Sequence, residues 1–245
     1  MSESSGTENT EVTAGSVGPI TGGTSHGWRQ SKWLAILELI LVVLIFVADA
    51  RHLIPFSKTP FLLALGWISL WVRKISWRRI GLTPYRSWKI TLALGVAAGI
   101  LMEGFELFIS QPMLVKILGK QPDLEVFRPL IGNIKVTLIF LALAWVLAAF
   151  GEEMVYRGYL MNRVADLFNR TRSAWVISLI AVHVAFALAH IYQGATGAID
   201  EGLMGLLLGL IYLRTCRNLS VPIVAHGVAD SIDFILMFMG KYPGM

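Results

Sequence analysis

Cysteine and charged residues are the two classes of side chain that this sequence has least of. A single cysteine, Cys216, stands among 245 residues, which excludes an intramolecular disulfide and a zinc site built from cysteines. Asp, Glu, Lys and Arg make up 15% of the chain, against about 25% in a typical soluble domain. The sequence has no HExxH zinc motif, no internal repeat and no second soluble domain, and no nucleic-acid partner is expected.

Apolar residues are correspondingly abundant, at 55% of the chain, and the mean hydropathy is +0.64. This composition is typical of a protein that crosses the bilayer several times. We predict an all-α fold, a polytopic membrane helix bundle of about seven transmembrane helices, with six or eight as alternatives. The expected spans are Trp33 to Ala48, Pro60 to Val72, Ile90 to Ile109, Ile134 onward, Ala174 to Ile191, Leu203 to Leu213, and Val221 to Met239.

Several of these apolar runs are shorter than the ~20 residues that a straight span needs. The helices are therefore expected to extend through polar residues that face protein. The pairs Gly95/Gly99 and Gly205/Gly209 have the GxxxG spacing that lets two helices approach closely. Residues 1–27 are rich in Ser, Thr, Gly and Glu and are predicted to form a disordered tail, without a cleaved signal peptide. Residues 28–245 are predicted to form the transmembrane helical domain.

Lys and Arg are divided unequally between the two sides of the predicted bundle. Fourteen lie on the side of the N-terminus and seven on the other. Cationic residues accumulate in cytoplasmic loops, so we predict an integral multi-pass protein of the plasma membrane with a cytoplasmic N-terminus. The segment around Asp200 and Glu201 lacks Lys and Arg, as expected of an outside loop.

The stretch from Gly151 to Gly158 places three charges directly after the fourth apolar run. A charge near the bilayer centre costs roughly 2.5–3.5 kcal/mol on insertion scales, so each of them needs a partner or a purpose. Glu153 and Arg157 are four residues apart and are expected to pair on one helix face. Glu152 lies on another face and has no such local partner.

The later apolar runs contain two further pairs at a spacing of four residues. Phe186 and His190 share one face of the fifth run, and His226 and Asp230 share one face of the seventh. Ionisable groups inside a membrane face the bundle interior, so three helices are expected to bring these groups and Glu152 to one site. A carboxylate held away from bulk water is a stronger base, and an imidazole opposite it holds the same water, which suits hydrolysis.

Four other ionisable side chains of the third, fifth and seventh apolar runs belong to no such pair. His183 and Asp233 are expected to be structural, with Asp233 near the outer end of its span. An interfacial position is expected for Glu103 and Glu106, and lining of a substrate path is the alternative.

Three motifs, in this order and on separate apolar segments, resemble those of the CPBP family. This family comprises the CAAX prenyl endopeptidases of the Rce1 type and the bacteriocin-processing and self-immunity (Abi) proteins. The segment from Trp77 to Pro84 also resembles the family's basic turn, so the protease-like core is expected to cover about residues 77–239. The three motifs are Glu152-Glu153-x-x-x-Arg157, Phe186-x-x-x-His190 and His226-x-x-x-Asp230.

The resemblance implies an intramembrane endopeptidase that hydrolyses a peptide bond of a membrane-associated protein or peptide, of CAAX type or in related C-terminal processing. Glu152 would be the general base, and His190 would hold the attacking water with it. His226 and Asp230 would form the oxyanion hole. The expected partners are the lipid bilayer and a peptide or protein substrate, with or without a lipid modification.

Three further positions have supporting roles in this hypothesis. Glu153 and Arg157 would brace the site or the substrate, with a purely structural ion pair as the alternative. Phe186 is expected to pack beneath the site.

One departure from the family pattern bears on the mechanism. The CAAX enzymes have Asn at the position of Asp230. An amide donates hydrogen bonds at any pH, whereas a carboxyl group donates only when it is protonated. Asp230 is therefore expected either to complete the oxyanion hole or to orient His226. No cofactor is expected, and zinc held by Glu152, His190 and His226 is the alternative.

Two other functions fit the same residues. One is a catalytically inactive protease fold that acts as a binding or self-immunity protein, and the other is a proton-coupled transporter, because membrane Glu and His also form proton relays. Depth within the bilayer is a difficulty for any shared site. At 1.5 Å per residue, Glu152 and His226 lie roughly 16 and 13 Å from the cationic ends of their helices but His190 roughly 27 Å. Strongly tilted helices, or a fifth span that starts deep in the bilayer, would bring them together.

Overall fold

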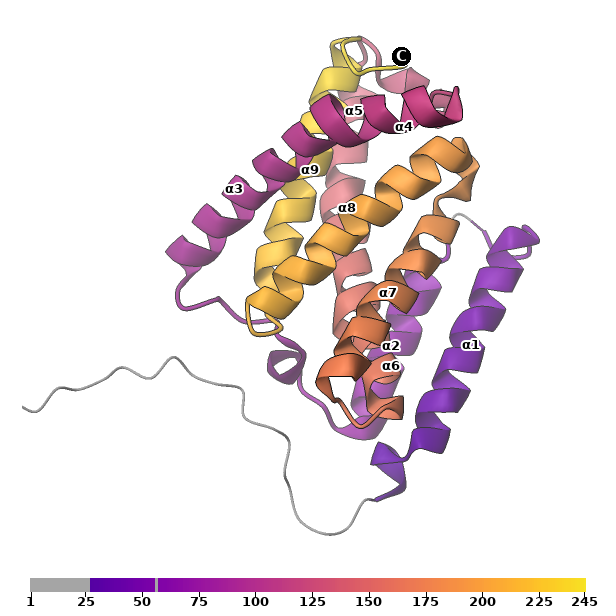
Figure 1. The fold of residues 1–245 in the computed structure, drawn as a ribbon, viewed down its shortest axis with the longest axis vertical. Coiled ribbons are helices and arrows are strands. Elements are labelled where there is room, and N and C mark those ends of the chain that lie inside the picture. The colour runs from indigo at the N-terminus through magenta and orange to yellow at the C-terminus, as the bar shows by residue number, and fades with distance from the viewer. Residues whose placement is uncertain (1–26, 56) are drawn as a thin grey trace, which may run out of the picture.

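The computed structural model describes residues 27–55 and 57–245, and it is all-helical in this part of the chain (Figure 1). The tail predicted over residues 1–27 lies, apart from Gly27, outside the described residues. Six helices are long and apolar enough to cross a membrane, and a seventh, α2, is apolar but shorter. The prediction of an all-α bundle of about seven membrane helices is confirmed.

The spans follow one another along the chain, two of them as composite helices. The membrane helices are α1 (Lys32–Ala50), α2 (Thr59–Arg73), α3–η3–α4 (Trp88–Phe105, Glu106–Ser110, Gln111–Leu118), α5–η5–α6 (Ile134–Leu143, Ala144–Leu160, Met161–Leu167), α7 (Arg172–Ala189), α8 (Gly194–Arg214) and α9 (Ser220–Phe238). Short 3₁₀ segments connect them: η1 (Trp28–Gln30), η2 (Trp77–Ile80), η4 (Glu125–Leu130) and η6 (Ile191–Gln193).

Local capping explains where several helices begin. A polar side chain precedes the first turn and accepts the otherwise unpaired backbone N–H three residues later, as at Ser31, Ser87, Asn133 and Thr171. At the other end of α2, Lys74 adopts the left-handed conformation (φ 54°) and stops the helix.

The helices extend further than the apolar runs of the sequence. The prediction of an outside loop at Asp200 and Glu201 was wrong, because both residues lie inside α8, which begins at Gly194. Glu103 and Glu106 also lie within helical segments, α3 and η3, and Glu103 is only 2% exposed. These acids face the protein interior, so the helices continue through them without presenting charge to lipid.

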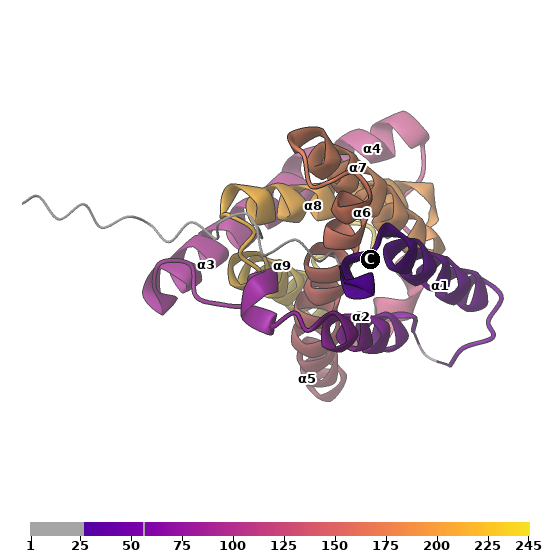
Figure 2. The same cartoon turned by 90° about the horizontal axis from the view of Figure 1, so that it is seen from below.

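The motif helix η5 lies in the middle of the bundle. It contacts α2, α9 and α7, and seen from below the continuous helix α5–η5–α6 passes between α9 and α2 (Figure 2). Helices α3 and α9 approach most closely at the first GxxxG pair, where a Cβ added to Gly95 or Gly99 would lie 2.5 Å from Val224 or from the Ala225 carbonyl oxygen. The second pair allows α8 to pack on α7, against Phe186 and His183. The outer faces of α1, α2, α3 and α5 expose large apolar side chains, as lipid contact requires.

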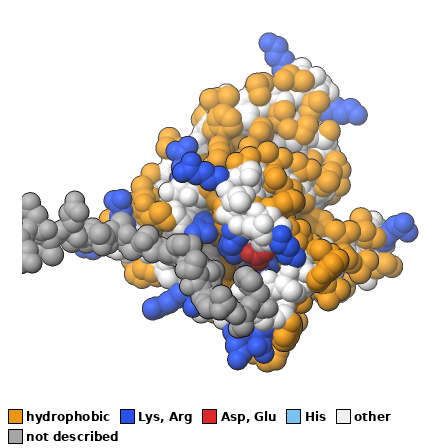
Figure 3. All heavy atoms as spheres, turned by 60° about the horizontal axis from the view of Figure 1, so that its bottom comes forward, with side chains coloured by type: hydrophobic (Ala, Val, Ile, Leu, Met, Phe, Trp, Pro, Cys, Tyr) orange, Lys and Arg blue, Asp and Glu red, His pale blue; other side chains and the backbone are white. Residues whose placement is uncertain are grey.

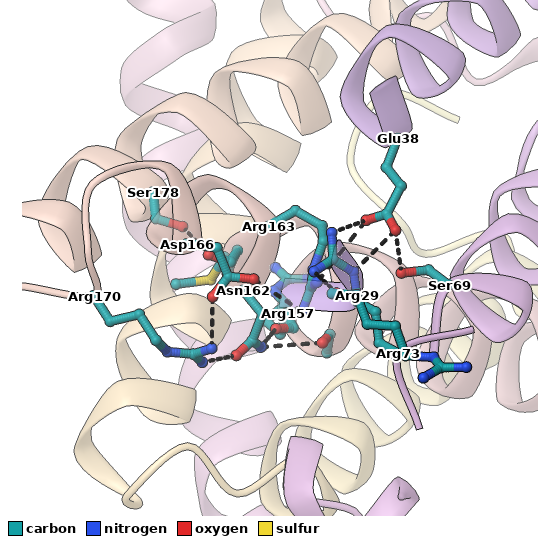
Figure 4. Close-up of polar contacts among 12 residues, drawn as sticks. Arg29, Glu38, Ser69, Arg73, Arg157, Asn162, Arg163, Asp166, Arg170 and Ser178 are labelled. Carbon is teal, nitrogen blue, oxygen red and sulfur yellow. Dashed lines mark hydrogen bonds and ion pairs between the residues drawn. The ribbon is translucent and has the colours of Figure 1, made fainter. Parts of the chain in front are cut away.

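One end of the bundle is rich in arginine. Figure 3 shows Lys and Arg side chains surrounding a small group of acidic atoms on this face. Glu38 of α1 accepts hydrogen bonds from Ser69 and Arg73 of α2, with the Arg73 Nε at 3.0 Å, and Arg163 of α6 lies 3.9 Å from it (Figure 4). Asp166 binds Arg163 at 3.1 Å. This network of buried ion pairs fastens α1 and α2 to α6, which continues the motif helix.

Candidate active site

The acidic motif lies on a widened helix. Residues 144–160 form π-helical turns, in which N–H groups bond to carbonyls five residues back, a rare geometry that is frequent at functional sites. Glu153 and Arg157 are fully buried, and their predicted pair is present at 2.7 Å. The Arg157 Nη2 also donates to the Gly205 carbonyl at 2.7 Å, and the guanidinium lies 5.2 Å from the centre of the Phe186 ring. Arg157 thereby ties η5 to α8 and α7.

His226 of α9 lies between two carboxylates. Its Nδ1 is 3.0 Å from Glu153 Oε1, and its Nε2 is 3.5 Å from Asp230 Oδ1. A carboxylate only accepts hydrogen bonds, so a ring that satisfies both must donate from both nitrogens, which the imidazolium form does. The direct carboxylate partner of Nδ1 is thus Glu153 rather than Glu152.

Glu152 forms no ion pair within residues 27–55 and 57–245. Its Oε1 accepts a long hydrogen bond of 3.5 Å from the hydroxyl of Thr59, which is buried at the start of α2. The carboxylate therefore keeps most of its hydrogen-bonding capacity. The sequence contains no signal that identifies Thr59 as its neighbour, because 93 residues separate the two.

His190 stands immediately after the last residue of α7. Its Nδ1 is 2.9 Å from the Phe186 carbonyl oxygen, which can only accept, so Nδ1 bears the proton. In the neutral ring Nε2 is then an acceptor. Phe186 is 2% exposed, and its ring lies 4.6 Å from that of His190 and 4.8 Å from that of Tyr156. As expected, Phe186 packs beneath the histidine and holds its orientation.

A cavity of about 350 Å³ brings the expected residues together. Glu152, His190, His226 and Asp230 all line it. The depth difficulty does not arise in the structure, because Glu152 of η5, His190 at the end of α7 and His226 of α9 line the same cavity. Figure 1 shows that the helices are inclined to one another, with α3 and α8 running obliquely past α9.

The cavity also has lining residues that the motifs do not identify. Ser57 and Thr59 lie beside Glu152, and the cavity continues past acidic side chains of η3, α8 and α9. The sequence contains a signal for two of these acidic residues, which are adjacent and precede an apolar run without a nearby Lys or Arg. The same pattern indicates a loop equally well. The acidic lining residues outside the motifs are Glu106, Asp200, Glu201 and Asp233.

The zinc alternative does not fit this arrangement. In the part of the chain that the structure describes, no three His, Cys, Asp or Glu side chains are placed to hold a metal ion. His226 directs one nitrogen at Glu153 and the other toward Asp230. The chemistry proposed below therefore uses no step through a metal.

Comparison with known proteins gives one family. Residues 134–232 match the model described as type II CAAX prenyl endopeptidase Rce1-like. The matched segment runs from the start of α5 to within α9 and includes all three motifs. No curated protein and no solved structure matches the chain.

Proposed function

Because residues 134–232 belong to the Rce1-like CAAX prenyl endopeptidase family, we propose that this chain is an intramembrane endopeptidase that cleaves a membrane-associated protein or peptide. The observation that supports it most is the convergence of Glu152 and His190 on one cavity, each with free acceptor atoms. Glu152 is partly buried, and a carboxylate inside a membrane bundle without an ion-pair partner is costly, so general-base catalysis accounts for its presence.

The side chains divide the reaction as follows. Glu152 takes a proton from a water that also donates a hydrogen bond to Nε2 of His190. The hydroxide adds to the substrate carbonyl carbon, and the negative charge moves to the carbonyl oxygen. That oxygen accepts a hydrogen bond from the Nε2–H of His226. This N–H is available because the contact of His226 with Asp230 is long. Glu152 then gives its proton to the leaving amine as the C–N bond breaks.

Within this scheme the other charged residues of the motifs position His226. Glu153 accepts from Nδ1 and fixes the ring, while Arg157 holds Glu153. The Asp230 oxygen lies 3.5 Å from Nε2 and orients the ring, so Asp230 is a positioning residue rather than a donor. Of the two roles expected for Asp230 from the sequence, we propose the orienting one.

The test replaces Glu152 with the isosteric amide. Membranes from cells that express wild type or Glu152→Gln are compared by proteomics of protein termini, and the candidate peptides are then offered to the purified proteins. We expect cleavage to fall by about 10³-fold or more, since loss of the base removes the proton acceptor. Glu125→Gln, an exposed carboxylate of η4, is the matched control and should cleave normally.

The two other functions predict different outcomes for the same variants. A binding or self-immunity protein would keep its phenotype in Glu152→Gln and show no cleavage in wild type. A proton-coupled transporter would show solute flux in liposomes without peptidolysis. Full peptidase activity of Glu152→Gln would overturn the proposed role of Glu152 directly.

A further inference from the structure

A second hollow of the molecule lies at the arginine-rich end of the bundle, between η1 and the end of α2. We call it the interfacial groove: it is lined by Trp28 and Arg29 of η1 and by residues 70–72 and 74–76. Its volume is about 520 Å³, and it shares no lining residue with the candidate active site. The proposed peptidase reaction uses none of these residues, so the groove has a separate role.

A buried arginine holds the two sides of the groove together. Arg73 is 7% exposed, and its Nη1 donates to the Arg29 carbonyl oxygen at 2.8 Å. The Nε of the same side chain donates to Glu38 of α1 at 3.0 Å. The main chain of η1 is thereby tied to the last turn of α2, so fixed contacts define the width of the groove.

Apolar side chains form most of the groove, at the level expected for lipid headgroups. Trp28 and Trp71 are exposed, and so are Trp33 and Trp67 near the same helix ends. Tryptophan is enriched where phospholipid headgroups meet the acyl chains, so this end of the bundle has the surface of a membrane interface. The apolar lining residues are Trp28, Leu70, Trp71, Val72 and Ile75.

The charged residues of the groove are both cations. Arg29 and Lys74 line it, and no Asp or Glu does so in the part of the chain that the structure describes. Neither cation forms an ion pair within residues 27–55 and 57–245, whereas the buried Arg73 pairs with Glu38. The Arg29 guanidinium lies 5.1 Å from the centre of the Trp28 ring, which orients it without neutralising its charge.

The backbone at the end of α2 also favours an anion in the groove. Lys74 adopts the left-handed conformation, and its N–H donates to the Trp71 carbonyl at 3.1 Å while that of Ile75 donates to the Leu70 carbonyl at 2.9 Å. Two of the terminal carbonyl oxygens of the helix are therefore already paired. The Ser76 hydroxyl caps no helix and adds a neutral donor.

We propose that the interfacial groove binds one anionic phospholipid from the leaflet at the arginine-rich end. Its phosphate accepts hydrogen bonds from Arg29 and Lys74, and an acyl chain lies against the apolar lining. Two cations without a carboxylate favour a headgroup of net negative charge over a zwitterionic one. A free phosphate ion would satisfy the cations but leave the apolar lining without a partner.

Lipid binding is measured by native mass spectrometry of the purified full-length protein in detergent. The protein is titrated with phosphatidylglycerol, with phosphatidylcholine of the same acyl chains, and with glycerol phosphate, which has no acyl chain. We expect the Kd of phosphatidylglycerol to be about tenfold lower than that of phosphatidylcholine, and glycerol phosphate not to displace it. Equal Kd values for the two lipids, or displacement by equimolar glycerol phosphate, would overturn the inference.

Paired substitutions then locate the preference on the protein. Arg29→Gln/Lys74→Gln should remove most of the advantage of phosphatidylglycerol while phosphatidylcholine binding stays the same. Arg78→Gln/Lys89→Gln removes two exposed cations that do not line the groove and should keep the full advantage. If the first pair does not fold, each of its single substitutions is measured. An equal loss in both pairs would show attraction by surface charge alone and would overturn the inference.

The other occupant to be tested is the chain's own N-terminal segment. Residues 1–26 include Glu3, Glu8 and Glu11 but no Lys or Arg. A preference for phosphatidylglycerol that appears only when these three residues are replaced by Gln would assign the groove to this segment and overturn the inference. The lipid site is independent of the proposed peptidase, so Glu152→Gln should bind both lipids like wild type.

Discussion

The ring of His226 depends on carboxylates from two different helices, and this arrangement can be probed one residue at a time. Glu153 fixes Nδ1 from η5, and Asp230 faces Nε2 from α9 itself. The two contacts have different lengths, 3.0 Å at Nδ1 and 3.5 Å at Nε2. The shorter contact fixes Nδ1, and the longer one leaves the Nε2–H able to donate to the substrate oxygen.

Replacement of Asp230 tests its positioning role. Asp230→Leu removes the acceptor oxygen beside Nε2, and we expect kcat to fall ~10- to 100-fold, the range for a buried donor left without its acceptor. Asp230→Asn keeps an acceptor oxygen and should remain within about threefold of wild type. Turnover of a cleaved peptide by the purified proteins provides the measurement. Wild-type turnover of the Leu variant would contradict this role.

Thr59 is the neighbour of Glu152 that the motifs do not identify. Thr59→Val keeps the shape but removes the hydroxyl, and because the hydrogen bond is long we expect a modest loss of kcat, ~2- to 10-fold. Thr59→Ser retains the hydroxyl and should differ little from wild type. The kcat of both variants is measured by steady-state kinetics. Equal kcat values for Thr59→Val and Thr59→Ser would contradict a role of the Thr59 hydroxyl in the site.

At this scale the sequence identified the residues but not their partners. The i, i+4 pairs Glu153–Arg157 and His226–Asp230 follow from helix spacing alone, and both are present. That Glu153 rather than Glu152 meets His226 depends on the rotation of η5 relative to α9. A single residue of rotation exchanges the two, and π-helical turns alter that rotation without a signal in the sequence.

At the scale of the helices, the network of ion pairs around Glu38 stabilises the arginine-rich end of the bundle. Glu38 is 5% exposed and lies between Arg73 and Arg163. Glu38→Gln leaves the buried guanidinium of Arg73 without a counter-charge, while Arg163 keeps Asp166, and the loss is expected to cost about 3–5 kcal/mol. Unfolding in detergent, followed by circular dichroism, should show a clearly lower midpoint.

The matched control for this network is an exposed ion pair. Arg128 and Glu125 lie 2.8 Å apart with side chains about 70% exposed. Glu125→Gln should change stability by less than about 1 kcal/mol, because solvent screens the pair. A Glu38→Gln protein as stable as Glu125→Gln would show that the buried network does not hold α1 and α2 in place.

The turn after η2 is fixed by one glycine. Gly81 has φ 101°, and a Cβ there would lie 1.9 Å from the Arg217 carbonyl oxygen, while its own carbonyl accepts from Leu219 N at 2.9 Å. Gly81→Ala is expected to cost about 2 kcal/mol or more through strain and displacement of the α8–α9 loop. Gly104→Ala, where no atom lies within 4 Å of the added Cβ, is the control and should be neutral or stabilising. Equal melting temperatures would contradict this contact.

At the scale of the whole molecule, the single cysteine allows the predicted orientation to be measured. Cys216 is exposed in the loop between α8 and α9, at the arginine-rich end. If that end is cytoplasmic, a membrane-impermeant maleimide should label Cys216 in inverted vesicles but not in intact cells. Lys120→Cys in a Cys216→Ala background places the label beyond α4, at the other end, and should give the opposite result. The reverse pattern would show that the bundle is inserted the other way.

Sequence by itself determined the number of helices, the residues of the three motifs and the gathering of arginine at one end. These features depend on apolar run length, on four-residue spacing and on charge counts, all of which are local. Only the tertiary structure decided that Asp200 and Glu201 belong to a helix and that they line one cavity with Glu106 and Asp233. The physical reason is that residues from η3, α8 and α9 meet through helix tilt and rotation, which packing among all the helices fixes and no single segment encodes.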